Sequence, residues 1–372
     1  MIRVLQILTD SNIGGAGRLL INYLHNFDRS VFDMLVVLPR GAELIPLVEA
    51  EGYPVWQMEH GRDKSFDMAA VGELKAVIRE YKPDIVHCHS SFSGKLAAFL
   101  CGVKGRFYTR HCAFPQPKKL TSFPGRQING LVNNTLSTHI VAVAQAAMDD
   151  LTVTGVDPKK ITVIINGVEP MRRAAEEEKA VLRQQLGLTE EHFVCGISAR
   201  LEDYKGHTYL LHAAAKLKES HPRLRYLVIG GGSMEEALRR EAADLGIADI
   251  VHFTGFVYDV APYYALMNLS INCSIGTETS CLALSEGYSL GIPAVASDFG
   301  GNPYMVTDGW NGYLVPQRNP EALAEKIAMI ADDPALYEKL CQGAGESYEQ
   351  KFTAAAMTRQ MEALYRKAMG IQ

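Results

Sequence analysis

The sequence predicts an α/β protein built from two doubly wound domains. Short apolar runs alternate with longer segments of helical periodicity, which is typical of parallel βαβ units. The chain has 372 residues, more than one usual hydrophobic core holds, so two domains are expected. Its hydrophobic fraction of 47% is that of an ordinary globular protein.

The predicted strands follow one another at regular intervals in both halves. In the first half they are residues 4–9, 34–39, 54–58, 84–89, 106–111, 139–144 and 161–166. In the second half they are residues 193–198, 225–230, 250–255, 269–274, 293–297 and 312–315. A turn at 166–168 leads into a charged helix expected to start near Met171, and a last helical pattern runs from Phe352 to Met369.

Composition narrows the class of protein further. No run reaches the roughly 18 apolar residues of a membrane helix, and the N-terminus passes from a short strand into a glycine loop without a cleavage site for a signal peptide. The seven cysteines form no C-x-x-C pair, which suits reduced thiols. We therefore expect a cytoplasmic protein, and no nucleic acid among its partners.

Glu278 and Glu286 stand eight positions apart between two predicted strands. If residues 279–290 form a helix, hydroxyl residues open it, and its free N–H groups offer a site for an anion. Glu278 then lies in the entry loop and Glu286 about two turns inside the helix. Taken alone, this spacing is also typical of a solvated helix face.

Arg200 and Lys205 follow another predicted strand, residues 193–198. Arginine offers a bidentate fork to phosphate oxygens and lysine a point charge. Two cations and a helix N-terminus can neutralise a diphosphate leaving group, and two carboxylates can hold sugar hydroxyls. Taken alone, the pair is more typical of a solvent-exposed helix start.

The ordered set of motifs resembles the retaining glycosyltransferases of family 4 (glycosyl transferases group 1), which have the GT-B architecture. The motifs are Arg-x4-Lys, Glu-x7-Glu, GIPAVAS, GGNP and DGWNGYLV. The resemblance implies two doubly wound, Rossmann-like domains facing a cleft. Residues 1–168 would form the acceptor-side domain and residues 169–351 the domain that binds the nucleotide sugar. Residues 352–372 would form a helix that crosses back to the first domain.

The resemblance also assigns roles in the second domain. Glu278 falls nearest the transferred sugar, and Glu286 falls where the family binds ribose hydroxyls. The remaining donor contacts are Arg200 and Lys205 for phosphate, the backbone of Thr279, Ser280 and Leu282, and Phe256 and Val257 beside the base. This chain departs from the family pattern by Thr-Ser-Cys after Glu278, Tyr304 after GGNP and Glu169 after Asn-Gly-Val.

In the first domain, Gly14 and Gly15 lie in NIGGAG before a helix predicted from Arg18 to Asn26. G-x-G-x-x-G is not present, so a tight turn is one interpretation; the resemblance implies a backbone contact to donor or acceptor. His111 ends a strand and matches the family's active-site histidine. His87 and His89 share one strand face and could bind a metal. Because no third ligand is evident nearby, we expect His89 to line the cleft or cap a loop.

These features predict a retaining, metal-independent transferase of the hexosyltransferase type. It is expected to move a sugar from a nucleotide diphosphate sugar to an acceptor hydroxyl, with UDP favoured over GDP. The expected acceptor is a lipid-linked or cell-envelope glycan, and the expected process is polysaccharide biosynthesis. No cofactor and no metal are expected, because no Asp-x-Asp follows a strand end. The alternatives are a sugar-nucleotide 2-epimerase of the same architecture and a non-catalytic sugar-binding receptor.

Residues 85–148 contain no Asp or Glu but carry seven Lys and Arg residues. Lys118, Lys119 and Arg126 stand there in a proline-broken, loop-like segment that also holds Phe114, Leu120 and Phe123. This mixture favours peripheral contact with an anionic membrane, at the inner face, or a lipid-linked phosphate acceptor. A cationic cleft wall that attracts the donor, or chance, explains it equally well.

Overall fold

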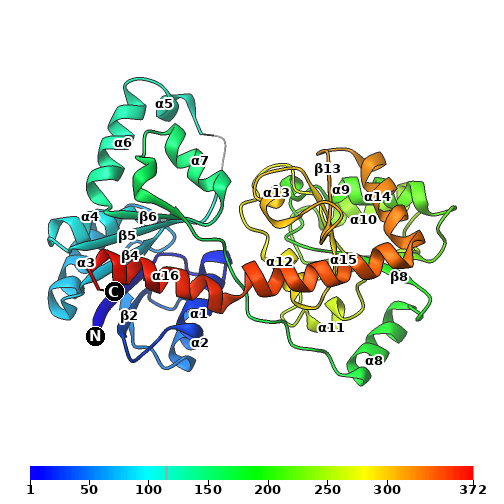
Figure 1. The fold of residues 1–372 in the computed structure, drawn as a ribbon, viewed down its shortest axis with the longest axis horizontal. Coiled ribbons are helices and arrows are strands. Elements are labelled where there is room, and N and C mark those ends of the chain that lie inside the picture. The colour runs from blue at the N-terminus through cyan, green and yellow to red at the C-terminus, as the bar shows by residue number, and fades with distance from the viewer. Residues whose placement is uncertain (114–115, 372) are drawn as a thin grey trace. The chain divides into compact units, whose positions relative to one another are not determined.

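A computed structural model describes residues 1–113 and 116–371. The chain divides into two compact units, drawn in Figure 1. Unit 1 comprises Met1–Val168 together with Thr353–Gln372, and unit 2 comprises Glu169–Phe352.

Unit 1 contains, within the described residues, one seven-stranded parallel sheet of order β3-β2-β1-β4-β5-β6-β7. Its strands are β1 (Ile2–Leu8), β2 (Phe32–Pro39), β3 (Val55–Met58), β4 (Ile85–His89), β5 (Gly105–Arg110), β6 (His139–Ala142) and β7 (Ile161–Val163). Its helices are α1 (Gly15–Asn26), α2 (Ile45–Ala50), α3 (Met68–Tyr81), α4 (Phe92–Leu100), α5 (Lys118–Thr121), α6 (Gly125–Leu136), α7 (Gln145–Val153) and α16 (Ala354–Ala368), with a 3₁₀ turn η1 (Pro158–Lys160).

The closing helix α16, red in Figure 1, is part of unit 1 and packs beside α1. Its buried side chains Met357, Met361 and Tyr365 lie in the same hydrophobic cluster as Leu20 and Leu24 of α1. The amphipathic spacing of that last segment therefore reflects burial against the sheet of unit 1.

Unit 2 contains, in the part that the structure describes, a six-stranded parallel sheet of order β10-β9-β8-β11-β12-β13. Its strands are β8 (Phe193–Ser198), β9 (Leu224–Ile229), β10 (Val251–Gly255), β11 (Leu269–Asn272), β12 (Ala294–Ser297) and β13 (Gly312–Val315). Its helices are α8 (Glu176–Leu186), α9 (His207–Leu217), α10 (Glu235–Asp244), α11 (Ala261–Tyr264), α12 (Leu282–Ser289), α13 (Asn302–Met305), α14 (Pro320–Asp332) and α15 (Pro334–Ser347). A 3₁₀ turn η2 (Asp203–Lys205) and a short π-helix η3 (Tyr348–Phe352) are also present.

In both sheets the strand order reverses near the middle, between β1 and β4 in unit 1 and between β8 and β11 in unit 2. Ligands of open parallel sheets bind beyond the carboxyl ends of the strands at such a reversal. Each predicted strand is confirmed, with shifts of at most three residues at its ends.

Two predicted boundaries were wrong. Helix α8 begins at Glu176 and not near Met171, because the Glu178 carboxylate accepts a hydrogen bond from the backbone N–H of Ala175 (2.7 Å) and so caps the helix there. Phe352, assigned to the closing helix, belongs to unit 2, where its fully buried ring lies 5.8 Å from the ring of Tyr288.

None of the helices in the described residues is both long and apolar enough to cross a membrane. All seven cysteines are free thiols.

Candidate active site

Predicted donor-binding residues of unit 2 follow the carboxyl ends of three of its strands. Arg200 comes after β8, Phe256 after β10 and Glu278 after β11. Because the strands are parallel, these ends lie along one edge of the sheet, with β8 and β11 at the strand-order reversal and β10 outermost. The fold therefore gathers residues that are far apart in the sequence.

Glu278 is the best-anchored group at this edge. Its Oε2 atom accepts hydrogen bonds from Lys205 Nζ (2.8 Å), Asn272 Nδ2 (3.0 Å) and Ser274 Oγ (2.8 Å). The side chain is 6% exposed. Its other oxygen, Oε1, has no partner among the described residues. One carboxylate oxygen is thus fixed by the protein, while the other can accept a hydrogen bond from a ligand.

Lys205 and Glu278 form an ion pair that is charged at neutral pH. Burial alone would raise the pKa of Glu278, but the charge of Lys205 and the hydrogen bonds from Lys205, Asn272 and Ser274 outweigh it and lower that pKa. Burial alone would lower the pKa of Lys205, but the Glu278 carboxylate outweighs this effect and raises the pKa of the lysine. The two predicted site residues therefore hold each other in the charged form.

Sequence reasoning missed Asn272 and Ser274. The predicted strand ran to Ser274, but β11 ends at Asn272, and the Asn272 Oδ1 atom accepts a hydrogen bond from the backbone N–H of Ser274 (3.0 Å). Polar side chains at the end of an apolar strand were the available signal, because that is where a parallel sheet presents ligand-binding groups.

Glycines hold the loop that carries Glu278. Gly300 has a φ of 57°, and a Cβ there would lie 2.1 Å from the backbone oxygen of Glu278. A Cβ on Gly301 would lie 1.6 Å from the oxygen of Thr279, and the Gly301 N–H donates to the oxygen of Glu278 (3.1 Å). The first two residues of the GGNP motif thus permit a close backbone approach that no other residue allows.

Arg200 is exposed, unlike Lys205. Its guanidinium lies 6.0 Å from the ring centroid of Tyr204 and forms no ion pair within the described residues. The next residue anchors the backbone, because Leu201 is fully buried and its N–H donates to the oxygen of Gly231 (3.0 Å). Arg200 is therefore a positioned cation whose donors remain available to an anion.

The helix that follows Glu278 starts later than predicted. Helix α12 runs from Leu282 to Ser289, so Thr279 and Ser280 lie in the preceding loop. The backbone of Gly301 packs closely against this loop at Thr279. The N–H groups of Leu282 and Ala283 find no acceptor in the part of the chain that the structure describes. The first-turn N–H groups are therefore available to an anion, and the predicted backbone contacts of Thr279 and Ser280 would come from the loop before the helix.

Glu286 lies about one turn inside α12, not two, because of the later start. The Tyr264 hydroxyl lies 3.4 Å from Glu286 Oε2 and 3.1 Å from the oxygen of Ala283. The buried Ser280 hydroxyl has no partner among the described residues. The Glu286 carboxylate and the Ser280 hydroxyl are both suited to bind a polar ligand.

The two residues predicted to contact the base, Phe256 and Val257, differ in exposure. Phe256 is 69% exposed, whereas Val257 packs against a buried cluster. Tyr258, which the sequence analysis missed, is 91% exposed, and its ring contacts that of Phe256 edge to face with centroids 5.0 Å apart. An aromatic residue two positions after Phe256 was the signal.

In unit 1, Gly14 is the N-cap of α1, and Gly15 is its first residue. The helix therefore begins three residues before the predicted Arg18. A Cβ on Gly15 would meet no atom within 4 Å, so the backbone is open to approach there.

His111 is held by a buried hydrogen-bond chain. His111 Nε2 lies 2.9 Å from His89 Nδ1, and His89 Nε2 lies 2.9 Å from Gln6 Oε1. Because the Gln6 oxygen can only accept, His89 Nε2 carries the proton and His89 Nδ1 accepts from His111. This order leaves His111 Nδ1 unprotonated and able to accept a hydrogen bond.

The chain continues on the other side of Gln6. Gln6 Nε2 donates to the Tyr365 hydroxyl of α16 (3.1 Å), which bonds His87 Nδ1, and His87 Nε2 bonds Thr109 Oγ1 (2.6 Å). Burial lowers the pKa of His87 to about 3 and that of His111 to about 4, so both rings are neutral at pH 7.

A metal site at His87 and His89 is not supported, because all four ring nitrogens are hydrogen-bonded. His89 is fully buried and does not line a surface. Among the described residues no group of three or more His, Cys, Asp or Glu side chains could hold a metal ion.

The basic segment predicted as a loop is largely helical. Lys118 and Lys119 lie on α5 and Arg126 in the first turn of α6, where its Nε donates to the oxygen of Val153 (3.1 Å). Phe123 between these helices is 82% exposed. Phe114 lies outside the described residues.

Two parallel-sheet, Rossmann-like units with these groups at the strand ends define the GT-B class of glycosyltransferases. The model of the family "Glycosyl transferases group 1" matches residues 178–347, and that of "Glycosyltransferase Family 4" matches residues 13–172. The chain belongs to the family 4 glycosyltransferases, and it is an enzyme of that type.

The relatives and solved structures agree with this assignment. The chain is 30% identical over 315 residues to "Putative glycosyltransferase EpsD" of Bacillus subtilis (strain 168), covering 80% of each protein. It is 31% identical over 207 residues to D-inositol 3-phosphate glycosyltransferase of Streptomyces bingchenggensis (strain BCW-1), which spans 53% of this chain and 45% of that protein.

Among solved structures, a glycosyltransferase from Rickettsia africae ESF-5 has a TM-score of 0.85 at 20% identity, covering 99% of this chain and 98% of that one. Alr3699/HepE of Anabaena, solved with UDP, has a TM-score of 0.83 at 22% identity, covering 99% of this chain and 100% of that one. These similarities show the fold.

Proposed function

We propose that this glycosyltransferase is retaining and moves a sugar from a UDP-sugar to an acceptor hydroxyl. The observation that carries the proposal is the Glu278 site, where one carboxylate oxygen is fixed by three hydrogen bonds and the other is left for a ligand. Arg200 and the first turn of α12 supply the donors that a diphosphate requires. UDP is favoured over GDP because the Anabaena structures were solved with UDP and UDP-glucose.

The proposed reaction is a front-face substitution. The bond between sugar C1 and the β-phosphate oxygen breaks, the acceptor oxygen bonds to C1 on the same face, and the acceptor proton passes to the leaving phosphate oxygen. Arg200, Lys205 and the N–H groups of α12 stabilise the charge that develops on the diphosphate. Glu278 Oε1 accepts from a sugar hydroxyl, and His111 Nδ1 has the acceptor lone pair that a second hydroxyl requires.

The nucleotide role of Glu286 is tested by UDP binding. Removing its carboxylate deletes two potential acceptors for the ribose hydroxyls, so Glu286→Ala is expected to weaken UDP binding about tenfold to a hundredfold. Calorimetric titration measures this directly. Glu219→Ala, which removes an exposed carboxylate elsewhere in unit 2, should bind UDP like the unaltered protein. Unchanged UDP affinity in Glu286→Ala would refute the ribose role.

We propose that turnover needs no metal ion, because side chains and a helix end provide the positive charge. UDP release from a UDP-sugar should continue at an unchanged rate in excess EDTA. Activity that stops on chelation and returns with Mg²⁺ or Mn²⁺ would contradict this proposal.

We also propose that Lys118, Lys119 and Arg126, with exposed Phe123 beside them, contact an anionic membrane from the cytoplasm. The D-inositol 3-phosphate relatives and this basic surface both favour a phosphorylated or lipid-linked acceptor. Each cation near such a surface contributes about 1 kcal/mol. Co-sedimentation should show salt-sensitive binding to anionic but not neutral liposomes, lost when all three residues are Ala. Equal failure to bind both vesicle types would rule out the contact.

A further inference from the structure

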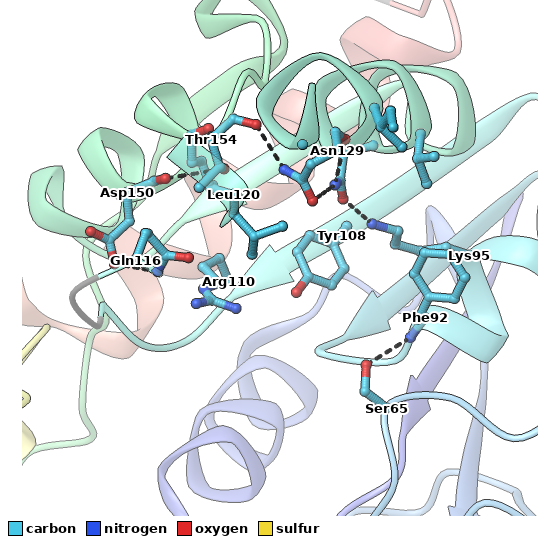
Figure 2. A pocket seen from close by; sticks show the side chains of 15 residues that line it. Ser65, Phe92, Lys95, Tyr108, Arg110, Gln116, Leu120, Asn129, Asp150 and Thr154 are labelled. Carbon is cyan, nitrogen blue, oxygen red and sulfur yellow. Dashed lines mark hydrogen bonds between the residues drawn. The ribbon is translucent and has the colours of Figure 1, made fainter. Parts of the chain in front are cut away.

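Unit 1 holds a cavity of about 420 Å³, and none of the residues assigned to the proposed reaction lines it. It lies between β5 and the helices α4, α6 and α7, and Leu120 of α5 also lines it. Its size is within the range of small-molecule sites, which is about 300–1,000 Å³. Figure 2 shows the side chains around it.

The acid-free stretch 85–148 supplies most of the cavity wall, including two cations, Lys95 and Arg110. In the view of Figure 2, Tyr108 lies between Lys95 and Arg110. One carboxylate, Asp150 of α7, also lines the cavity and accepts a hydrogen bond from Gln116 (3.3 Å). Two cations against one carboxylate leave the cavity positive.

Lys95 is the unusual member of this set. It is 4% exposed, and Asn133 Oδ1, 2.6 Å from Nζ, is its one hydrogen-bond acceptor among the described residues. The ammonium lies 4.2 Å from the ring centroid of Tyr108 and pairs with no described carboxylate. An ammonium group has three N–H donors, and a buried cation without an anion is costly. An anionic ligand would remove that cost.

Part of the lining is apolar. It consists of Leu120, Ile128, Val132 and Leu151, and Ile128 is 59% exposed. The amides inside are already used, because Asn129 Nδ2 donates to the oxygen of Thr154 (2.8 Å) and Asn133 Nδ2 to the oxygen of Asn129 (2.9 Å). The cavity therefore combines cationic donors with an apolar face and offers few free groups for neutral hydroxyls.

We propose that this cavity binds the phosphate group of a phosphorylated acceptor, with Lys95 and Arg110 on the anion and the apolar wall on its nonpolar part. This inference rests on the proposed function, since it names the acceptor class of that reaction. The phosphate could belong to a polyprenyl phosphate or to a soluble sugar phosphate, and the two sources share this chemistry.

Calorimetric titration tests the site without any turnover. The probes are glucose 1-phosphate, free glucose and farnesyl phosphate in phosphatidylcholine nanodiscs. One of the phosphorylated probes should bind and glucose should not. Tighter binding of farnesyl phosphate assigns the site to a lipid phosphate, and tighter binding of glucose 1-phosphate to a soluble one. Lys95→Met should weaken binding at least about tenfold, because it deletes a charged hydrogen-bond donor, while exposed Lys104→Met should not.

A second variant keeps the proposal testable if Lys95→Met folds poorly. Ile128→Glu places a carboxylate at the exposed edge of the cavity and should also weaken phosphate binding about tenfold. Leu131→Glu on the same helix, 70% exposed and outside the cavity lining, is the matched control. UDP binding should be unchanged in all variants. If UDP binds but neither phosphorylated probe does, or if Lys95→Met and Ile128→Glu bind phosphate normally, the inference is wrong. If UDP itself does not bind, the proposed function fails first.

Discussion

Replacing Arg200 with Ala is expected to lower turnover about a hundredfold and to leave the fold intact. The guanidinium is exposed and forms no ion pair with any described residue, so its removal leaves no buried charge unpaired. Its proposed partner is the diphosphate, whose charge increases as the sugar leaves. A lost charged hydrogen bond at such a site costs about 3 kcal/mol, or about a hundredfold in rate.

The measurement is UDP release from a UDP-sugar under saturating donor. Arg223→Ala is the matched control, because Arg223 is exposed in the same unit at the opposite, amino-terminal end of β9. Arg200→Lys should recover part of the rate, since lysine keeps the charge but loses the bidentate fork. Turnover near the unaltered rate in Arg200→Ala would remove this residue from the mechanism.

Lys205→Met is expected to reduce both activity and stability, unlike Arg200→Ala. The substitution keeps side-chain length but leaves the Glu278 carboxylate buried without its cation. Breaking a buried pair in this way costs about 3–5 kcal/mol. Glu278→Gln should cost less stability, because the Lys205 side chain is 19% exposed and can reach water. It should still abolish most turnover.

The double variant separates the two effects. Lys205→Met combined with Glu278→Gln removes both charges, so stability should return most of the way while activity stays low. Trp56 lies in unit 1 and Trp310 in unit 2, so urea unfolding of a Trp56→Phe background, followed by Trp310 fluorescence, reports on unit 2. If the double variant is as unstable as Lys205→Met, the ion pair is not the source of the loss.

Strand positions could be predicted because apolar runs mark buried strands of a parallel sheet. The contacts of Glu278 could not. They depend on β11 ending at Asn272 and on the Gly301 backbone approaching Thr279, and neither is visible as a period in the sequence. The hydrogen-bond chain that holds the histidines could not be predicted either, because it passes through Tyr365, which is 278 residues away from His87 in the sequence.

Prolines misled the interpretation of the basic segment. Three prolines suggested a loop, but Pro117 and Pro124 stand at the N-caps of α5 and α6. Proline is tolerated at a helix start, where its missing N–H would have no partner in any case. These prolines therefore mark helix starts, and the cavity lined by residues of α5 and α6 could not be predicted.

The most direct test of the proposed function is analysis of the products formed from a UDP-hexose with and without a phosphorylated acceptor. NMR spectroscopy identifies both the nucleotide product and the anomeric configuration of the new glycoside. The proposed reaction gives UDP and a glycoside with the configuration of the donor, and gives the glycoside only when the acceptor is present. Isomerised UDP-sugar formed without acceptor, or a glycoside of inverted configuration, would contradict it.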